Sequence, residues 1–157
     1  MKISLILVGK TDDTFIKQAV DIYSKRLSHY IQLNVHVISE IKNSGKLAES
    51  ELKEREGELV LKQVQPADFV LLLDDKGKQF TSVEYATYLQ RLMNAGTKNL
   101  VVVVGGAFGF SEKVYKRANA QLSLSKMTFT HQLVRVFFLE QTYRALTILK
   151  GESYHHD

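Results

Sequence analysis

The sequence predicts an α/β fold, in which a mostly parallel sheet carries helices on both faces. Near-continuous apolar runs over residues 3–8, 69–73 and 99–104 are typical of strands buried on both faces of a sheet. Segments with apolar residues at helical spacing separate these runs, as expected for parallel strands. Because neither an internal repeat nor a Pro/Gly/Ser-rich linker interrupts the 157 residues, we expect one domain over residues 1–157.

The first half of the chain supplies three strands, two helices and a loop. An N-cap at Thr11-Asp12-Asp13 begins the first helix, and the β-branched residues Val35, Val37 and Ile38 mark the second strand. The second helix is highly charged, which is typical of a solvated surface, and Pro66 ends it. In order, the predicted elements are a strand over 3–8, a helix through Phe15 to Leu27, a strand over 33–38, a polar loop over 39–45, a helix over 46–64 and a strand over 69–73.

The second half alternates in the same way. Thr81 and Glu84 have the spacing of a capping box, and Ser111-Glu112 begins a short helix. In order, the predicted elements are a turn over 74–78, a helix through Ala86 to Met93, a strand over 99–104, a glycine loop, a helix over 112–120, a short strand over 121–124 and a last helix over 130–149.

Composition limits the class of protein. The chain has no cysteine, so thiol chemistry is excluded and a reducing cytoplasm is expected. The N-terminus lacks the pattern of a signal peptide, and no apolar run approaches the ~20 residues of a membrane span, so we expect no membrane association. The net charge of +4 is compatible with a nucleic-acid partner without requiring one.

A glycine-rich loop directly follows the apolar strand 99–104. Gly105-Gly106-Ala107-Phe108-Gly109 exposes backbone amides where α/β proteins bind ligands. The loop matches neither the dinucleotide pattern Gly-x-Gly-x-x-Gly nor a phosphate loop, since no Gly-Lys-Ser/Thr follows. It is therefore either a cofactor loop or simply a tight turn between a strand and a helix.

A second loop, residues 122–132, carries hydroxyl, amine and apolar side chains together. Thr130 as an N-cap accounts for one hydroxyl of this loop. Met127 and Phe129 in a polar turn suit the flat face and the sulfur region of an adenosine ligand. The two loops together predict a cofactor cleft.

The last predicted helix is apolar nearly all round, which is typical of a helix buried on both sides. In a chain of this size, one of those sides is expected to face a second subunit. Glu140 and Arg144, four residues apart, form either a helix ion pair or a positioned pair at a dimer interface. In the tail, His155 and His156 have no third ligand nearby, so no metal site is predicted.

The C-terminal third resembles the bacterial ribosomal large subunit methyltransferase H family. The resemblance is carried by the Gly-Gly loop, by Leu-Ser-Leu-Ser-Lys-Met-Thr-Phe-x-His-Gln at 122–132, by Glu-Gln-x-Tyr-Arg-Ala at 140–145 and by Gly-Glu-x-Tyr-His at 151–155. The opening Met-Lys-Ile, Val8-Gly9-Lys10 and Tyr23-Ser24-Lys25-Arg26-Leu27 also fit, so it covers essentially the whole chain.

This resemblance implies an enzyme of the SPOUT superfamily that methylates N3 of a pseudouridine in 23S rRNA of the assembled ribosome. It implies a trefoil knot in the C-terminal part, an exception to the usual rule against threading, and an obligate homodimer. S-adenosylmethionine would be the cofactor. The positions that match the family's cofactor site are Leu73, Gly105, Leu124, Ser125, Lys126, Met127, Thr128 and Phe129.

The same resemblance assigns Arg144, Tyr154 and His155 to the catalytic site, with the tail reaching the active site of the partner subunit. Arg144 would stabilise the anionic ring of the target, and either His155 or a water would take its proton. One departure from the family is Thr130, where many members have proline, and another is the additional His156-Asp157.

Other readings of the sequence remain open. A chain that kept this fold without activity would be a non-catalytic ribosome-binding or RNA-binding factor. An ordinary doubly wound nucleotide-binding enzyme is opposed by the missing Gly-x-Gly-x-x-Gly. No dedicated RNA-binding module is visible, so contact with the ribosome would use scattered basic residues, for which the candidates are Lys10, Lys25, Arg26 and Arg135.

Overall fold

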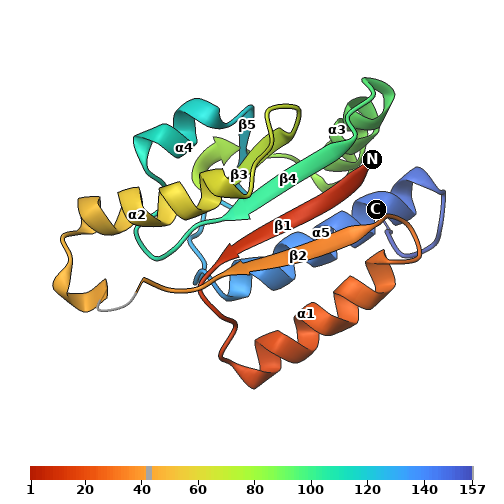
Figure 1. The fold of residues 1–157 in the computed structure, drawn as a ribbon. Coiled ribbons are helices and arrows are strands. Elements are labelled where there is room, and N and C mark those ends of the chain that lie inside the picture. Colours follow the sequence, from red (N-terminus) through yellow and green to blue (C-terminus); the bar gives the residue numbers. More distant parts are fainter. Residues whose placement is uncertain (42–43, 157) are drawn as a thin grey trace.

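A five-stranded sheet forms the centre of the fold. The computed structural model describes residues 1–41 and 44–156, so Lys42 and Asn43 of the predicted polar loop, and Asp157 of the tail, lie outside the described residues. The strand order is β2-β1-β4-β3-β5, and every neighbouring pair is parallel (Figure 1). The predicted α/β class is confirmed, and the sheet is entirely parallel.

Strands and helices alternate along the described chain. The strands are β1 (Lys2–Val8), β2 (Leu33–Ile38), β3 (Phe69–Lys78), β4 (Asn99–Val104) and β5 (Ala120–Leu122). The helices are α1 (Thr14–Leu27), α2 (Glu49–Lys62), α3 (Ser82–Asn94), α4 (Glu112–Arg117) and α5 (Leu133–Leu149), and a single 3₁₀ turn spans Ser44–Lys46.

Helices cover both faces of the sheet, as predicted. Side chains of successive strand residues point to opposite faces. In β1, Ile3, Leu5 and Leu7 pack in the cluster shared with α1, α3 and α5, whereas Ile6 and Val8 pack in the cluster shared with α2 and α4. Figure 1 shows α1 and α5 on the side of the sheet opposite α2.

The capping signals in the sequence are confirmed, but several boundaries move. Asp13 caps α1, and Thr81 and Glu84 form a reciprocal capping box on α3. The fourth helix ends at Arg117 and not at residue 120, because the backbone N–H of Asn119 donates to the carbonyl of Val70 at 2.8 Å. The helix therefore ends three residues early, and β5 begins at Ala120, one residue before the predicted strand.

The bounds of α2 and α5 also differ from the predicted ones. The charged helix predicted over 46–64 is α2, Glu49–Lys62, preceded by the 3₁₀ turn. The last helix begins at Leu133 and not at residue 130. Its first turn still uses Thr130, because the Oγ1 atom of Thr130 accepts from the backbone N–H of Leu133 at 3.2 Å.

The predicted turn over 74–78 is wrong, because these residues continue β3. Leu73 and Lys78 both pair with Leu122, so the strand bulges between them and returns to the same partner. A Cβ atom on Gly77 would lie 2.6 Å from backbone atoms of Leu122, so only glycine fits this approach. The bulge carries residues 74–76 out to the carboxyl edge of the sheet, beside the glycine loop.

Candidate functional site

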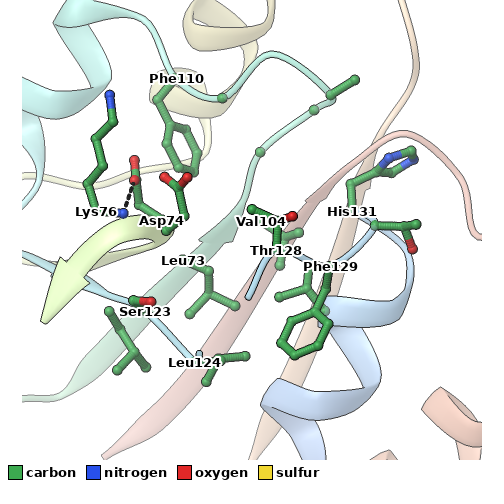
Figure 2. Close-up of a pocket in the computed structure, with 18 of the residues that line it drawn as sticks. Leu73, Asp74, Lys76, Val104, Phe110, Ser123, Leu124, Thr128, Phe129 and His131 are labelled. Atoms are coloured by element: carbon green, nitrogen blue, oxygen red, sulfur yellow. Dashed lines mark hydrogen bonds between the residues drawn. The ribbon is translucent and has the colours of Figure 1, made fainter. Parts of the chain in front are cut away.

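A cavity of about 660 Å³ lies at the carboxyl ends of β3, β4 and β5 (Figure 2). Three chain segments line it, namely residues 73–76, residues 104–110 and most of residues 122–134, and Tyr115 of α4 adds one side chain. Crevices at this edge of a parallel sheet are the usual ligand sites of α/β proteins, and the volume suits a small molecule.

The structure brings together seven of the eight residues that sequence reasoning assigned to the cofactor. Lys126 is the exception, because it lies in the second loop without lining the cavity. The seven that line the cavity are Leu73, Gly105, Leu124, Ser125, Met127, Thr128 and Phe129.

Gly105 directly follows β4 and is one of the residues that line the cavity. A Cβ atom at this position would lie 3.0 Å from the Cε1 atom of Phe110 and 3.4 Å from the carbonyl oxygen of Gly109. A larger side chain would therefore push the Phe110 ring or fill the space that the loop leaves. The backbone of Gly105 is thus accessible from the cavity because the residue has no side chain.

Hydroxyl groups shape the second loop from within. The Oγ atom of Ser123 donates to the carbonyl of Ser125 at 2.8 Å, and the Oγ atom of Ser125 accepts from the backbone N–H of Met127 at 2.9 Å. These bonds turn the backbone so that Met127 is 76% exposed beside the cavity. The ring of Phe129 lies 4.6 Å, centroid to centroid, from that of Phe137 on α5.

Sequence reasoning missed a polar pair in this cavity. The hydroxyl of Tyr115 donates to the Oδ2 atom of Asp74, and the backbone N–H of Lys76 donates to the Oδ1 atom at 2.9 Å. Burial, and then the bond to Asp74, raise the pKa of the Tyr115 hydroxyl, which therefore stays protonated. The position of Asp74 immediately after an apolar strand could have identified it, whereas nothing local marks Tyr115.

Arg135 has no exposed surface, so the prediction that it contacts RNA is wrong. Its guanidinium donates to the carbonyl of Val8 at 2.9 Å, the hydroxyl of Thr11 at 2.7 Å and the carbonyl of His131 at 3.1 Å. Burial lowers the pKa of this guanidinium. Arg135 therefore ties the loop after β1 to the first turn of α5, where His131 lines the cavity.

The three residues assigned to catalysis lie together in the structure. The Nε and Nη2 atoms of Arg144 donate to the Oε1 atom of Glu140, at 3.1 and 2.6 Å, and these bonds raise the pKa of Arg144. The guanidinium lies over the ring of Tyr154, 4.7 Å from its centroid. The Nη1 atom of Arg144 is 3.4 Å from the Nδ1 atom of His155.

This catalytic cluster, Arg144, Tyr154 and His155, is distant from the cavity of its own chain. Val134, near the start of α5, lines the cavity. Arg144 lies ten residues further along the helix, which is about 15 Å at 1.5 Å per residue. Figure 1 shows α5 running from the carboxyl ends of the strands back towards the N-terminal side of the sheet. A small ligand in the cavity therefore does not reach Arg144 of the same chain.

Large apolar side chains remain exposed on α1 and α5. Phe15 is 68% exposed, and Ile22, seven residues later on the same face of α1, is 52% exposed. Phe137 of α5 is 38% exposed and shares its helix face with Glu140 and Arg144. In a single chain α5 therefore leaves apolar surface open, and the second subunit expected on that side stays a prediction.

Two kinds of feature are absent from the described residues. In residues 1–41 and 44–156, no helix is long and apolar enough to cross a membrane. Within the same ranges, no group of three or more histidine, aspartate or glutamate side chains is arranged to hold a metal ion.

Comparison with known proteins gives matches along the full chain. A family described as "Predicted SPOUT methyltransferase" matches residues 1–155. The "Ribosomal RNA large subunit methyltransferase H" of Parabacteroides distasonis is 54% identical over 157 residues, covering all of both chains. The proteins with the same name from Christiangramia forsetii and Bacteroides thetaiotaomicron are 53% and 48% identical over 156 and 157 residues, covering 99% and 100% of both chains.

Proposed function

The chain belongs to the SPOUT methyltransferase family, and from this we propose that it methylates N3 of a pseudouridine in 23S rRNA within the assembled ribosome. Its full-length relatives are named as methyltransferases of large-subunit ribosomal RNA, and this chain is an enzyme of that kind. The observation that carries the proposal is the cavity, because two of the three segments that line it, the glycine loop and residues 122–132, carry the family resemblance.

S-adenosylmethionine is the proposed cofactor, and the cavity fits it. When bound, this cofactor supplies an electrophilic methyl group on a sulfonium. The open backbone at Gly105 would meet the adenosine part closely, and Phe129 and Leu124 offer apolar surface to its flat base. Asp74 adds a carboxylate to the same cavity. Methyl transfer in line depends mainly on positioning, which these walls supply.

A homodimer is proposed because the cavity and the catalytic cluster lie far apart within one chain. The exposed side chains Phe15, Ile22 and Phe137 offer an apolar surface for a second copy, and the pair Glu140–Arg144 lies on the same face as Phe137. A two-fold arrangement would bring the tail of one subunit to the cavity of its partner. Each active site would then contain groups from both chains.

The dimer is tested by sedimentation velocity at micromolar concentration. The wild-type chain should sediment as a dimer, and Ile22→Glu should shift it towards monomer, because an ionised side chain would be buried unpaired. Val83→Glu is the matched control, since Val83 is an exposed apolar residue on α3. A wild-type monomer would remove the composite site from the account.

Within the composite site, Arg144 would stabilise negative charge that develops on the target ring as its N3 proton leaves. Burial raises the pKa of the Tyr154 hydroxyl, so this hydroxyl stays protonated and donates to Glu140. His155, or a water beside it, would accept the proton. Glu140 holds Arg144 and Tyr154 in place by accepting from both.

A trefoil knot in the C-terminal part is also proposed. It is supported by the bulge of β3, where Leu73 and Lys78 both pair with Leu122 and hold the start of the second loop against the strand. Tracing the chain in an experimental structure tests this directly: the segment leading into α5 should pass through a loop formed by earlier residues.

The substrate would be read by shape and charge, with exposed lysines and arginines such as Lys10, Lys25 and Arg26 meeting phosphates. A ribosomal substrate places the proposed activity in the cytoplasm. The test is transfer of labelled methyl from S-adenosylmethionine to ribosomes lacking the modification, with naked rRNA beside them. Label in N3-methylpseudouridine from ribosomes supports the proposal. Cofactor binding without transfer to either substrate would favour a non-catalytic ribosome-binding factor.

A further inference from the structure

The charged side chains that line the cavity are concentrated on one wall. Asp74, Asp75 and Lys76 follow one another in the bulge of β3, while the facing loop contributes mainly apolar and hydroxyl side chains, with the imidazole of His131 at its end. Two carboxylates against one ammonium leave this wall with a formal charge of −1. The wall is therefore suited to a ligand that carries net positive charge.

Asp74 is the group on this wall whose charge acts most strongly. It is half-buried, whereas Asp75 and Lys76 are exposed, and solvent screens exposed charges far more. Figure 2 shows the side chains of Asp74 and Lys76 both extending from the bulge on the side of Phe110, away from Phe129, with the Lys76 ammonium at the outer end. Because Lys76 is exposed, solvent screens its positive charge more than the negative charge of the half-buried Asp74, so the wall stays net negative at Asp74.

Tyr115 and the backbone of Lys76 fix the direction of this carboxylate. Each of the two Asp74 oxygens accepts one hydrogen bond, from the Tyr115 hydroxyl and from the Lys76 N–H. A carboxylate oxygen has room for a further contact after accepting one bond. Tyr115 is in turn held against Phe110 of the glycine loop, with ring centroids 5.8 Å apart. The orientation of the Asp74 carboxylate is thus set by α4 and by its own strand.

We propose that Asp74 makes the cavity select the cationic methyl donor over its neutral product. This rests on the proposed function. S-adenosylmethionine carries a sulfonium, an ammonium and a carboxylate, and so a net charge of +1. After the methyl group leaves, S-adenosylhomocysteine has a thioether and no net charge. The attraction of Asp74 for the ligand is therefore lost with the methyl group, which favours exchange of product for fresh donor.

The experiment is calorimetric titration of the full chain with three ligands of one skeleton. S-adenosylmethionine and sinefungin, which has an amine where the S-methyl group would be, are the cationic probes, and S-adenosylhomocysteine is the neutral one. In Asp74→Asn, both cationic probes should bind about tenfold more weakly, while the neutral one changes by less than about twofold. Tyr115→Phe, which keeps the carboxylate but frees its orientation, should show a smaller loss of the same selectivity.

The matched control is Asp68→Asn, which removes the same charge at the opposite end of β3, where Asp68 accepts from Asn99 and from the N–H of Gln65. It should leave all three affinities unchanged. An equal loss for all three ligands in Asp74→Asn, or no loss, would overturn the charge selection while leaving the cofactor assignment intact. Failure of the wild-type chain to bind any of the three would overturn the proposed function as well.

Discussion

The hydroxyl of Tyr154 donates to the Oε1 atom of Glu140 at 3.1 Å, which fastens the C-terminal tail to the middle of α5. The same oxygen accepts from Arg144, and the ring of Tyr143 meets that of Tyr154 edge-on with centroids 4.7 Å apart. The tail is therefore an ordered part of the fold. Its contacts lie further along α5 than Val134, the residue of this helix that lines the cavity.

Deleting residues 153–157 should leave cofactor affinity unchanged and reduce turnover by at least about tenfold, because the tail supplies Tyr154 and His155 of the catalytic cluster and does not line the cavity of its own chain. Titration calorimetry and methyl transfer, measured on the same preparation, separate the two effects. The point variant Tyr154→Phe, which removes only the hydroxyl and with it the bond to Glu140, should cause a smaller loss. Full turnover by the truncated chain would take the tail out of the mechanism.

Gly105→Val should abolish cofactor binding and leave the dimer intact. The new side chain would collide with the ring of Phe110 and fill the approach to the backbone, whereas α1 and α5 are untouched. Calorimetry measures cofactor binding, and sedimentation velocity measures whether the dimer forms. Gly45→Val serves as the control, since a Cβ atom there has no neighbour within 4 Å. Wild-type affinity in Gly105→Val would contradict the placement of the cofactor.

Arg135→Met should lower the free energy of unfolding by about 3 kcal/mol or more, because it leaves three acceptors without their buried donor. Urea unfolding at one fixed protein concentration measures this. Lys17→Met, on the exposed side of α1, should change the free energy by less than about 0.5 kcal/mol. A similar small change in Arg135→Met would show that the loop after β1 does not depend on this side chain.

Glu56→Gln should stabilise the protein at neutral pH and have no effect in acid. Burial, and then the nearby charge of Glu40, raise the pKa of the Glu56 carboxyl in the folded state. Its ionised form therefore costs stability, and that cost appears as pH rises past the ordinary pKa of a glutamate. Since Glu56 is only half-buried, the gain should stay below about 1 kcal/mol.

Unfolding free energies of Glu56→Gln and wild type, compared across pH 4 to 8, check this. The two curves should coincide at low pH and separate as pH rises. Asp21→Asn, an exposed change on α1, should show no such separation. A gap of the opposite sign would mean that the ionised carboxylate of Glu56 makes a favourable contact in the folded state.

The fold and the presence of a cleft at this edge of the sheet could be predicted because their signals are local, whereas the individual cofactor residues were proposed from the family resemblance. Leu73 and Gly105 stand where apolar runs stop, and in a parallel sheet those ends meet at one edge. The β3 bulge could not be predicted in this way, since it depends on Leu122, more than forty residues away. Without knowledge of that pairing, Asp-Asp-Lys-Gly-Lys is predicted to be a turn, and the position of Asp74 in the cavity cannot be predicted.

Arg135 shows a second limit of sequence reasoning. The sequence offers Arg135 as one of the basic residues that contact the ribosome, whereas a buried guanidinium needs several acceptors around it. Two of its acceptors, Val8 and Thr11, lie more than 120 residues earlier in the chain. Only the three-dimensional arrangement brings them together, whereas the Glu140–Arg144 pair, four residues apart, could be predicted from spacing alone.

A heterodimer of two defective chains tests the composite active site most directly. One chain carries Gly105→Val with an intact tail, and the other lacks residues 153–157 with an intact cavity. The heterodimer, purified through two different tags, is assayed for labelled methyl transfer to unmodified ribosomes. If the tail serves the partner's cavity, one complete site is restored, and activity should reach about half that of wild type. If activity stays at the level of the two defective homodimers, the tail acts within its own chain and the account is wrong.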